Sequence, residues 1–380
     1  MSLSSAPQRL SILLTATAAV FATPALASDM FVYFGSHSKG PNIGFSVARF
    51  DTDTGKLTTP VFLQEAVAPA YFMIHPDGRH LYTCNSDPGS SISAYSIDPA
   101  TAKLTLLNEL PSGGGEPCYV GLDRTRRYLM VANYYAGNIA VFALHPDGSI
   151  GERTAFIQHA GSSINRERQT QPHAHTIRVD SNNRFVLVAD LGVDKLFVYR
   201  FDEKTGALKP NDPPFATVAP GSGPRHLAFG KNDRNVYLIN ELSSTIARFG
   251  WDSKTGVLTP CETVSTLPKD FKGMSTCAEV LMHPGGKFVY ATNRGDDSVA
   301  VFSVDAKTGR LTLVQHVPTR GKTPRNCEFD PTGKWLLVSN HDSNNAVVFR
   351  IDPKTGRLTQ TGEPVTVPSP FCERFLPVKK

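Results

Sequence analysis

The sequence predicts an all-β fold, a seven-bladed β-propeller with four antiparallel strands per blade. Three observations support this prediction. A polar turn recurs seven times, a strand that ends in Asn or Asp recurs six times, and no segment has a helical hydrophobic period of useful length. The recurring strands end at intervals of 48, 57, 50, 53 and 47 residues. Four short strands in roughly 50 residues is the pattern of a propeller blade.

Each repeat has the same order of elements, as residues 221–260 illustrate. The alternating runs LAF, VYLIN and TIARFGW are followed by a Lys-Thr-Gly turn and by VLT, which starts a fourth strand. The copies of the turn are DTDTGKLT (51–58), DPATAKLT (98–105), HPDGSI (145–150), DEKTGALK (202–209), DSKTGVLT (252–259), DAKTGRLT (305–312) and DPKTGRLT (352–359). The recurring strands end at Asn85, Asn133, Asp190, Asn240, Asn293 and Asn340. Because these Asn side chains recur, we interpret them as a device of the fold, a turn hydrogen bond.

The two ends of the chain are predicted to complete one blade. The segment FVYFGS (31–36) matches a second strand, and its missing first strand is supplied by the tail SPFCERFLPV (369–378). This arrangement closes the ring and removes an open edge. Two tandem β domains are the alternative, but an uninterrupted repeat without a linker argues against it.

The N-terminus is predicted to be a secretory signal peptide, residues 1–27. Arg9 precedes an apolar run from Leu10 to Ala22, and Ala25-Leu26-Ala27 is an A-x-A cleavage site. An uncleaved anchor is the alternative, although the run is short for a membrane span. We therefore expect a periplasmic or secreted protein in which residues 28–380 form one propeller domain.

Composition excludes several classes of partner and site. The net charge is only +5, without a Lys/Arg run, so nucleic acid is not an expected partner. No second apolar stretch reaches spanning length, so no membrane span is expected after cleavage. The six cysteines show no C-x-x-C spacing, and we expect no metal, no cofactor and a monomer. Cys84 and Cys118 are the one pair whose repeat positions could allow a disulfide.

The blade repeat predicts which side chains meet at one mouth of the central channel. The start of the first strand and the end of the second strand of every blade face the same mouth. Consecutive blades place there His175, Arg225, Glu241, Arg294, Arg325 and His341, with His173 and His226 alongside. Three arginines around one mouth indicate an anionic ligand, because guanidinium groups bind carboxylate or phosphate bidentately. A neutral histidine or a glutamate beside them could move a proton.

Structural roles remain open for some of these residues. Arg225 and Glu241 could form an ion pair that only holds the blades together, and His173 could only satisfy a turn. The sequence has no G-x-S-x-G or H-E-x-x-H motif and no apparent Cys–His pair, so a nucleophilic enzyme is not indicated.

The segments PHAHTIRVD (172–180), GPRHLAF (223–229), NEL (240–242), TNR (292–294) and PRNCEFDPTGKWLLVSN (324–340) resemble the seven-bladed propeller lactonase family. That family includes bacterial 6-phosphogluconolactonases and, on a similar fold, the fungal carboxy-cis,cis-muconate cyclases. The resemblance covers residues 29 to 380. It implies a lactone-handling site at the channel mouth, formed by His175, Arg225, Glu241 and Arg294.

The resemblance leads to our first hypothesis, a metal-independent hydrolase that opens an anionic sugar lactone, nominally 6-phospho-D-glucono-1,5-lactone, to the aldonic acid. His175 or Glu241 would activate water, while Arg325, His173, His226 and His341 would help to bind substrate. An export signal departs from the cytoplasmic setting expected for the phosphorylated substrate and leaves room for an unphosphorylated lactone. A lactonising cyclase and a non-enzymatic periplasmic binding propeller remain as alternatives.

Overall fold

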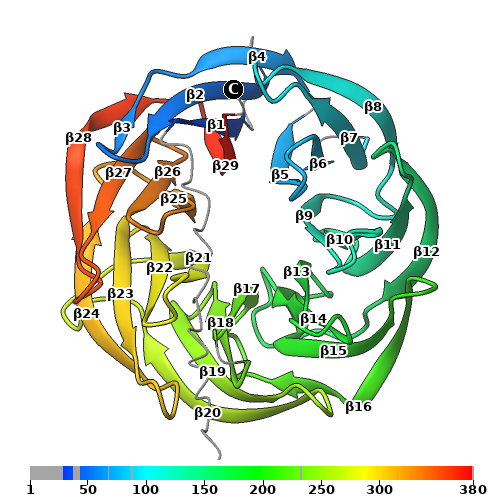
Figure 1. Cartoon of the computed structure of the whole chain (residues 1–380). Coiled ribbons are helices and arrows are strands. Elements are labelled where there is room, and N and C mark those ends of the chain that lie inside the picture. Colours follow the sequence, from blue (N-terminus) through cyan, green and yellow to red (C-terminus); the bar gives the residue numbers. More distant parts are fainter. Residues whose placement is uncertain (1–28, 37–42, 67, 87–88, 232, 379–380) are drawn as a thin grey trace, which may run out of the picture.

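A computed structural model describes residues 29–36, 43–66, 68–86, 89–231 and 233–378. In these residues, seven antiparallel sheets stand radially around a central channel (Figure 1), which confirms the predicted seven-bladed propeller. The predicted signal peptide, residues 1–27, lies outside the described residues. Within the described part of the chain, no helix is long and apolar enough to cross a membrane.

We number the blades along the chain and list the strands of each from the channel outward. Blade 1 contains β29 (Pro370–Pro377), β1 (Asp29–Ser36), β2 (Gly44–Asp51), β3 (Lys56–Leu57) and β4 (Val61–Glu65). Blade 2 contains β5 (Pro69–Ile74), β6 (His80–Asn85), β7 (Ser91–Ile97) and β8 (Leu104–Pro111). Blade 3 contains β9 (Pro117–Leu122), β10 (Tyr128–Asn133), β11 (Asn138–Leu144) and β12 (Ile150–Gln158). Blade 4 contains β13 (Ala174–Val179), β14 (Phe185–Asp190), β15 (Lys195–Asp202) and β16 (Ala207–Thr217), with the short 3-10 helix η1 (Leu191–Val193).

The remaining three blades are built in the same way. Blade 5 contains β17 (Pro224–Phe229), β18 (Asn235–Asn240), β19 (Thr245–Asp252) and β20 (Val257–Ser265). Blade 6 contains β21 (Thr276–Met282), β22 (Phe288–Arg294), β23 (Ser298–Val304) and β24 (Leu311–Pro318). Blade 7 contains β25 (Pro324–Phe329), β26 (Trp335–Asn340), β27 (Asn345–Ile351) and β28 (Leu358–Thr366). The prediction that both chain ends share blade 1 is confirmed, because β29 pairs with β1 from Met30–Pro377 to Ser36–Pro370.

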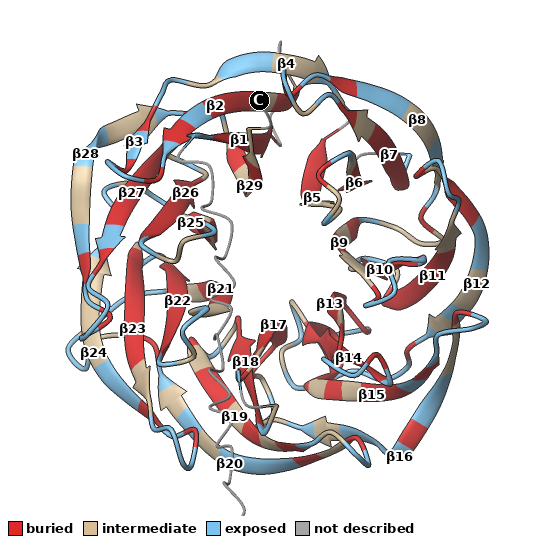
Figure 2. Ribbon diagram, viewed as in Figure 1, coloured by how far each residue is buried: buried red, intermediate tan, exposed pale blue. Residues whose placement is uncertain are grey.

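The hydrophobic core lies between the blades. Second strands such as β10 and β18 are buried at every position, whereas the outermost strands carry mostly exposed and intermediate residues (Figure 2). This difference follows from the sequence. The second strands are nearly continuous apolar runs, whereas apolar and polar residues alternate along the outer strands. Neighbouring blades therefore pack face to face, and their first strands contact one another around the channel.

The seven-fold turn joins each blade to the one before it. In six blades, a Tyr hydroxyl or Trp indole on the second strand donates to a carbonyl of the next blade's turn, as Tyr237 does to Gly309 at 2.8 Å. The other donors are Tyr33, Tyr82, Tyr128, Tyr290 and Trp335. In blade 4, Phe185 packs under Gly256 of the following turn, and the amide of Asn211 donates to two carbonyls of that turn. The turn recurs because in every blade it forms the contact with the preceding blade.

The recurring asparagines also have a structural role, as the sequence predicted. Asn133 donates to the carbonyl of Ser112 and to the Asn138 side chain, and Asn340 makes the equivalent bonds to Thr319 and Asn345. All six cysteines, which lie in the described part of the chain, are free thiols, so the possible disulfide between Cys84 and Cys118 does not form. Each of these two thiols instead faces backbone carbonyls.

Candidate functional site

The predicted mouth residues that come from first strands lie where those strands bulge. In β17 the pairing with β18 skips from Pro224 to Leu227, which leaves Arg225 and His226 outside the ladder. A single-residue skip in β13 leaves out His175, and another in β25 leaves out Arg325. Bulges re-aim side chains next to functional sites. The first-strand column that the repeat singled out is therefore a column of bulge residues.

Glu241 is the centre of the site. Its carboxylate lies 3.1 Å from Nε of Arg225, 2.9 Å from Nη2 of Arg294 and 2.8 Å from Nη2 of Arg168. Glu241 is only 4% exposed. Burial alone would raise the pKa of Glu241, but the guanidinium groups of Arg294 and Arg225 hold it far below the usual range. Glu241 is therefore an anion at all physiological pH values and orients its arginines rather than accepting a proton.

Backbone carbonyls hold two of these arginines in place. Arg225 donates from Nη1 to the carbonyl of Ala278 at 2.6 Å, and Arg294 donates from Nη2 to the carbonyl of Cys277, also at 2.6 Å. The Cys277 amide in turn donates to the carbonyl of Glu241 at 3.1 Å. Blades 5 and 6 are thus tied together at the site, and the guanidinium groups are positioned before any ligand arrives.

Arg168 belongs to the site but was missed in the sequence. It lies in the connection between β12 and β13, and the same Nη2 atom that contacts Glu241 donates to the Tyr134 hydroxyl at 3.0 Å. The only signal in the sequence was the interval of 57 residues between Asn133 and Asp190, the longest in the series. That excess length is the loop that carries Arg168 to the channel mouth.

His173 supports this loop. Its ring stacks on Tyr134 at 4.4 Å between centroids, its Nδ1 lies 2.9 Å from the Tyr134 carbonyl, and its backbone amide donates to Asp190. These contacts agree with the structural role that the sequence left open for His173. They fix Tyr134, which in turn holds Arg168.

His175 lies beside the Glu241 cluster. Its ring is 5.4 Å from the ring of Tyr134 and 5.1 Å from that of His226. Burial, with the positive charge of Arg225, lowers the pKa of His175 well below its usual value. The imidazole is therefore neutral at pH 7, the form that accepts a proton.

A cysteine accompanies this histidine, although no Cys–His pair was apparent from the sequence. Sγ of Cys118 lies 3.8 Å from Nδ1 of His175. The blade repeat separates the two residues by 57 positions, and only the packing of β9 on β13 brings them together. Burial raises the pKa of Cys118 to about 12, so this thiol stays protonated and is not a thiolate nucleophile at neutral pH.

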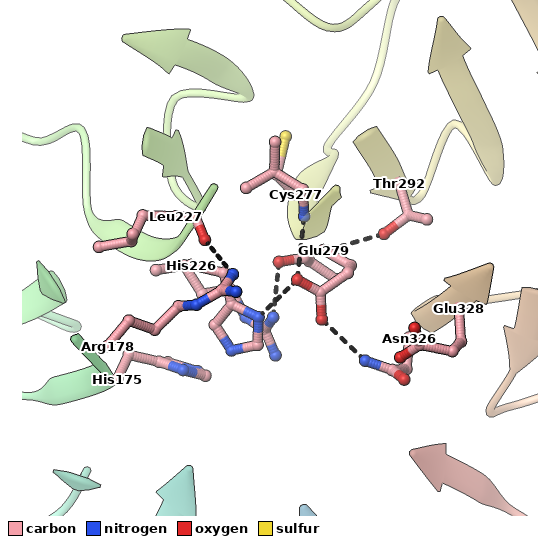
Figure 3. A network of polar contacts seen from close by, with 12 residues as sticks. His175, Arg178, His226, Leu227, Cys277, Glu279, Thr292, Asn326 and Glu328 are labelled. Carbon is pink, nitrogen blue, oxygen red and sulfur yellow. Dashed lines mark hydrogen bonds and ion pairs between the residues drawn. The ribbon is translucent and has the colours of Figure 1, made fainter. Parts of the chain in front are cut away.

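His226 faces a different carboxylate. Its Nδ1 lies 2.9 Å from Glu279, whose other oxygen accepts a hydrogen bond of 2.8 Å from Asn326 (Figure 3). Burial lowers the pKa of His226 and raises that of Glu279. The buried Nε2 of His226 has no hydrogen-bond partner among the described residues. His226 therefore contacts the Glu241 site through the ring of His175. Its own hydrogen bond belongs to a separate network with Glu279 and Asn326.

Arg325 and His341 lie together on the blade 7 side of the mouth. The Arg325 guanidinium stacks over the ring of Phe371 at 3.7 Å, and the His341 ring is 5.2 Å from the same ring. His341 also contacts Asp342 at 2.6 Å. Arg325 makes no ion pair or hydrogen bond with any residue that the structure describes. Burial, followed by the charges of Arg225 and Arg294, lowers the pKa of Arg325 well below its usual value.

The cluster can stabilise negative charge and accept a proton. Three guanidinium groups surround one carboxylate, and that of Arg325 lies on the blade 7 side of the mouth. Positive charge is therefore in excess, and a neutral imidazole lies at its edge. Among the described residues, the one trio spaced to hold a metal ion is His75, Asp77 and His80, in a blade 2 turn away from the mouth. There Nδ1 of His75 accepts from the Asp77 amide at 3.2 Å, a turn contact.

Known proteins share this fold and length. The family model described as "Lactonase, 7-bladed beta-propeller" matches residues 31–375. The 6-phosphogluconolactonase of Bacillus subtilis strain 168 is 34% identical over 345 residues, which cover 90% of this chain and 97% of that protein. An uncharacterized protein of Lactococcus lactis subsp. cremoris is 31% identical over 300 residues, covering 79% of this chain and 85% of that protein.

A solved structure adds a second activity to this group. The periplasmic gluconolactonase of Pseudomonas aeruginosa has a TM-score of 0.88 and 32% identity to this chain, with 93% of this chain and 100% of that chain covered. The family model spans nearly the whole propeller, including the blades that carry the Glu241 cluster. The chain belongs to the seven-bladed β-propeller lactonase family.

Proposed function

We propose that this protein hydrolyses a sugar lactone to the corresponding aldonic acid, nominally 6-phospho-D-glucono-1,5-lactone to 6-phosphogluconate. The observation that carries the proposal is the neutral, buried His175 at the edge of a cluster with excess positive charge. Lactone hydrolysis needs a base for water and a stabiliser for the oxyanion, and these two elements supply both. The names of family members at 32–34% identity support the same reaction class.

The reaction would proceed by direct attack of water. Nε2 of His175 takes a proton from water as the water oxygen bonds to the lactone carbonyl carbon, and the carbonyl oxygen becomes an oxyanion. Arg294 and Arg225 stabilise this charge, and the buried Nε of Arg294, which lacks a hydrogen-bond partner among the described residues, is a donor for it. The tetrahedral intermediate then expels the ring oxygen, which receives the proton from the His175 imidazolium.

The four arginines of the site would have different roles. Arg168, Arg225 and Arg294 share the charge of Glu241, whereas Arg325 has only the face of Phe371. A guanidinium without a carboxylate partner is the natural anchor for an anionic substituent of the substrate. We therefore assign Arg325 to the phosphate or carboxylate end of the ligand.

An unphosphorylated gluconolactone is the second candidate substrate. The predicted export signal and the periplasmic gluconolactonase of Pseudomonas aeruginosa both favour it. With this substrate the protein would act in the periplasm or outside the cell, where phosphorylated sugars are not the expected supply.

The test is a pH-stat titration of purified protein with gluconolactone and with its 6-phosphate, corrected for spontaneous hydrolysis. Acid release above the buffer rate with either lactone supports hydrolysis, and the ratio of the two rates identifies the substrate. If neither lactone is hydrolysed faster than in buffer, the protein is not a sugar lactonase. Turnover of a carboxymuconate in a parallel spectrophotometric assay would then favour the cyclase alternative.

A further inference from the structure

The channel contains a second chamber, deeper than the Glu241 cluster. Two adjoining cavities of about 580 and 280 Å³ share Arg124, Arg178, Leu281, Glu328 and Arg374 among their lining residues. Four of these residues lie further along the first strands than the mouth residues do, and Arg124 lies in the turn that follows β9. On β13, for example, Arg178 follows His175 by three positions, which corresponds to roughly 10 Å along a strand.

A layer of aromatic and hydrogen-bonded side chains lies between the two sites. The rings of Tyr71 and Tyr119 stack at 4.3 Å between centroids, and the His226 ring meets both edge-on at 5.8 and 5.3 Å. Both tyrosines and Glu279 line the smaller cavity, and neither cavity is lined by a residue of the Glu241 cluster. The deeper chamber is thus a separate site.

Two arginines in this chamber lack a carboxylate partner. Nη1 of Arg178 donates to the carbonyl of Leu227 at 2.8 Å (Figure 3). Nε of Arg124 donates to the carbonyl of Asp180 at 2.9 Å, and its Nη2 donates to the carbonyl of Val179 at 3.3 Å. Neither side chain makes an ion pair with any residue in the described part of the chain. Backbone carbonyls therefore fix both guanidinium groups without neutralising them.

The carboxylates of the chamber are already engaged. Glu328 pairs with Arg374 at 2.9 Å, and Glu279 accepts from His226 and Asn326. Burial, followed by the nearby charge of Arg178, lowers the pKa of Arg124, which indicates that the two cations are close to each other. An anion between them would relieve this repulsion.

We infer that the deeper chamber is an anion-binding site, in which Arg124 and Arg178 hold the carboxylate or phosphate group of a small molecule. Two prepositioned guanidinium groups match the geometry of either group. The stacked tyrosines and the apolar side chains of Met73 and Leu122 also line the smaller cavity, so they would contact the uncharged part of the ligand. Arg124 is exposed, which gives a ligand access from solvent.

Isothermal titration with inorganic phosphate and with gluconate, at constant ionic strength set with chloride, tests this inference. The two titrations distinguish a phosphate ligand from a carboxylate ligand. We expect Arg124→Met and Arg178→Met to weaken binding of the preferred anion by about 10- to 100-fold, since each removes charge-assisted hydrogen bonds. Arg357→Met is the matched control, because Arg357 is also an exposed arginine that donates to a backbone carbonyl, but in a turn of blade 7.

Arg325→Met distinguishes binding in the chamber from binding at the channel mouth. This variant removes the free guanidinium of the mouth and leaves the chamber intact. Anion binding that persists in Arg325→Met and is lost in Arg124→Met supports the chamber. The inference is overturned if wild-type protein binds neither anion at 10-millimolar concentrations. It is equally overturned if both chamber variants bind as wild type does, or if Arg325→Met alone abolishes all binding. Arg124 lies outside the Glu241 cluster, so its variant should keep the wild-type hydrolysis rate.

Discussion

Nε of Arg225 lies 3.1 Å from Oε2 of Glu241, which follows it by sixteen residues in the same blade. The pair is not isolated, because the same carboxylate also forms ion pairs with Arg294 of blade 6 and with Arg168 of the loop before blade 4. The ion pair expected as one structural alternative is thus one part of a cluster that joins three parts of the ring. Glu241 therefore has a structural role whatever its role in chemistry.

Glu241→Gln should lower the free energy of unfolding at pH 7 by about 3–5 kcal/mol, because three arginines would lose their buried counter-charge. The pKa of Glu241 is depressed in the folded protein. Its stabilisation is therefore fully present above the unfolded pKa of about 4.3 and is lost as pH falls toward the folded value. Urea unfolding between pH 3 and 8 should show a constant gap between wild type and variant above about pH 5, shrinking below it. A gap that stays constant down to pH 3 would contradict this assignment.

The blade repeat made much of the site predictable. Arg225, Glu241 and Arg294 occupy fixed positions relative to the recurring Asn, so counting residues along the repeat was enough to bring them to one mouth. The strand pattern was predictable for the same reason, since buried second strands are apolar at nearly every position.

The other features of the site could not be predicted, because they depend on local geometry that differs from blade to blade. Arg168 lies in a loop found in one blade only, so no equivalent position predicted it. The two-residue bulge in β17 turns Arg225 toward Glu241 and His226 toward Glu279, and a repeat aligned on the strand cannot show that consecutive residues serve different networks. The contact of Cys118 with His175 likewise depends on packing between blades.

His175→Ala should lower kcat for lactone hydrolysis by about 10²- to 10⁴-fold, the usual contribution of a positioned base. His145→Ala, in an exposed turn, is the control and should keep the wild-type rate. The pKa of His175 is lowered by burial and by Arg225, so the neutral base should persist below the usual histidine pKa of about 6.5. The pH–rate profile of the wild type should therefore stay flat through pH 6.5 and decline only at lower pH. Full activity in His175→Ala would remove this histidine from the mechanism.

Arg325→Met should discriminate between the two lactones. Because this guanidinium is the one assigned to the anionic end of the substrate, kcat/KM for the 6-phosphate should fall by about 10- to 100-fold, while that for the unphosphorylated lactone should change little. Steady-state kinetics on both substrates measure the difference, with the exposed Arg350→Met as control. An equal loss on both lactones would instead place Arg325 at the reacting carbonyl.

Gly256→Ala tests the contact between neighbouring blades. Gly256 has a φ of 75°, and an added Cβ would lie 2.5 Å from the Phe185 ring and 2.9 Å from the Asn211 amide. Gly362 has a similar φ of 66° but open space around its Cβ position, so Gly362→Ala measures the backbone cost alone. We expect Gly256→Ala to be less stable than Gly362→Ala by about 1–3 kcal/mol, the usual cost of overpacking, as measured by urea midpoints at equal m-value. Equal midpoints would mean that the recurring turn does not hold the blades together through this glycine.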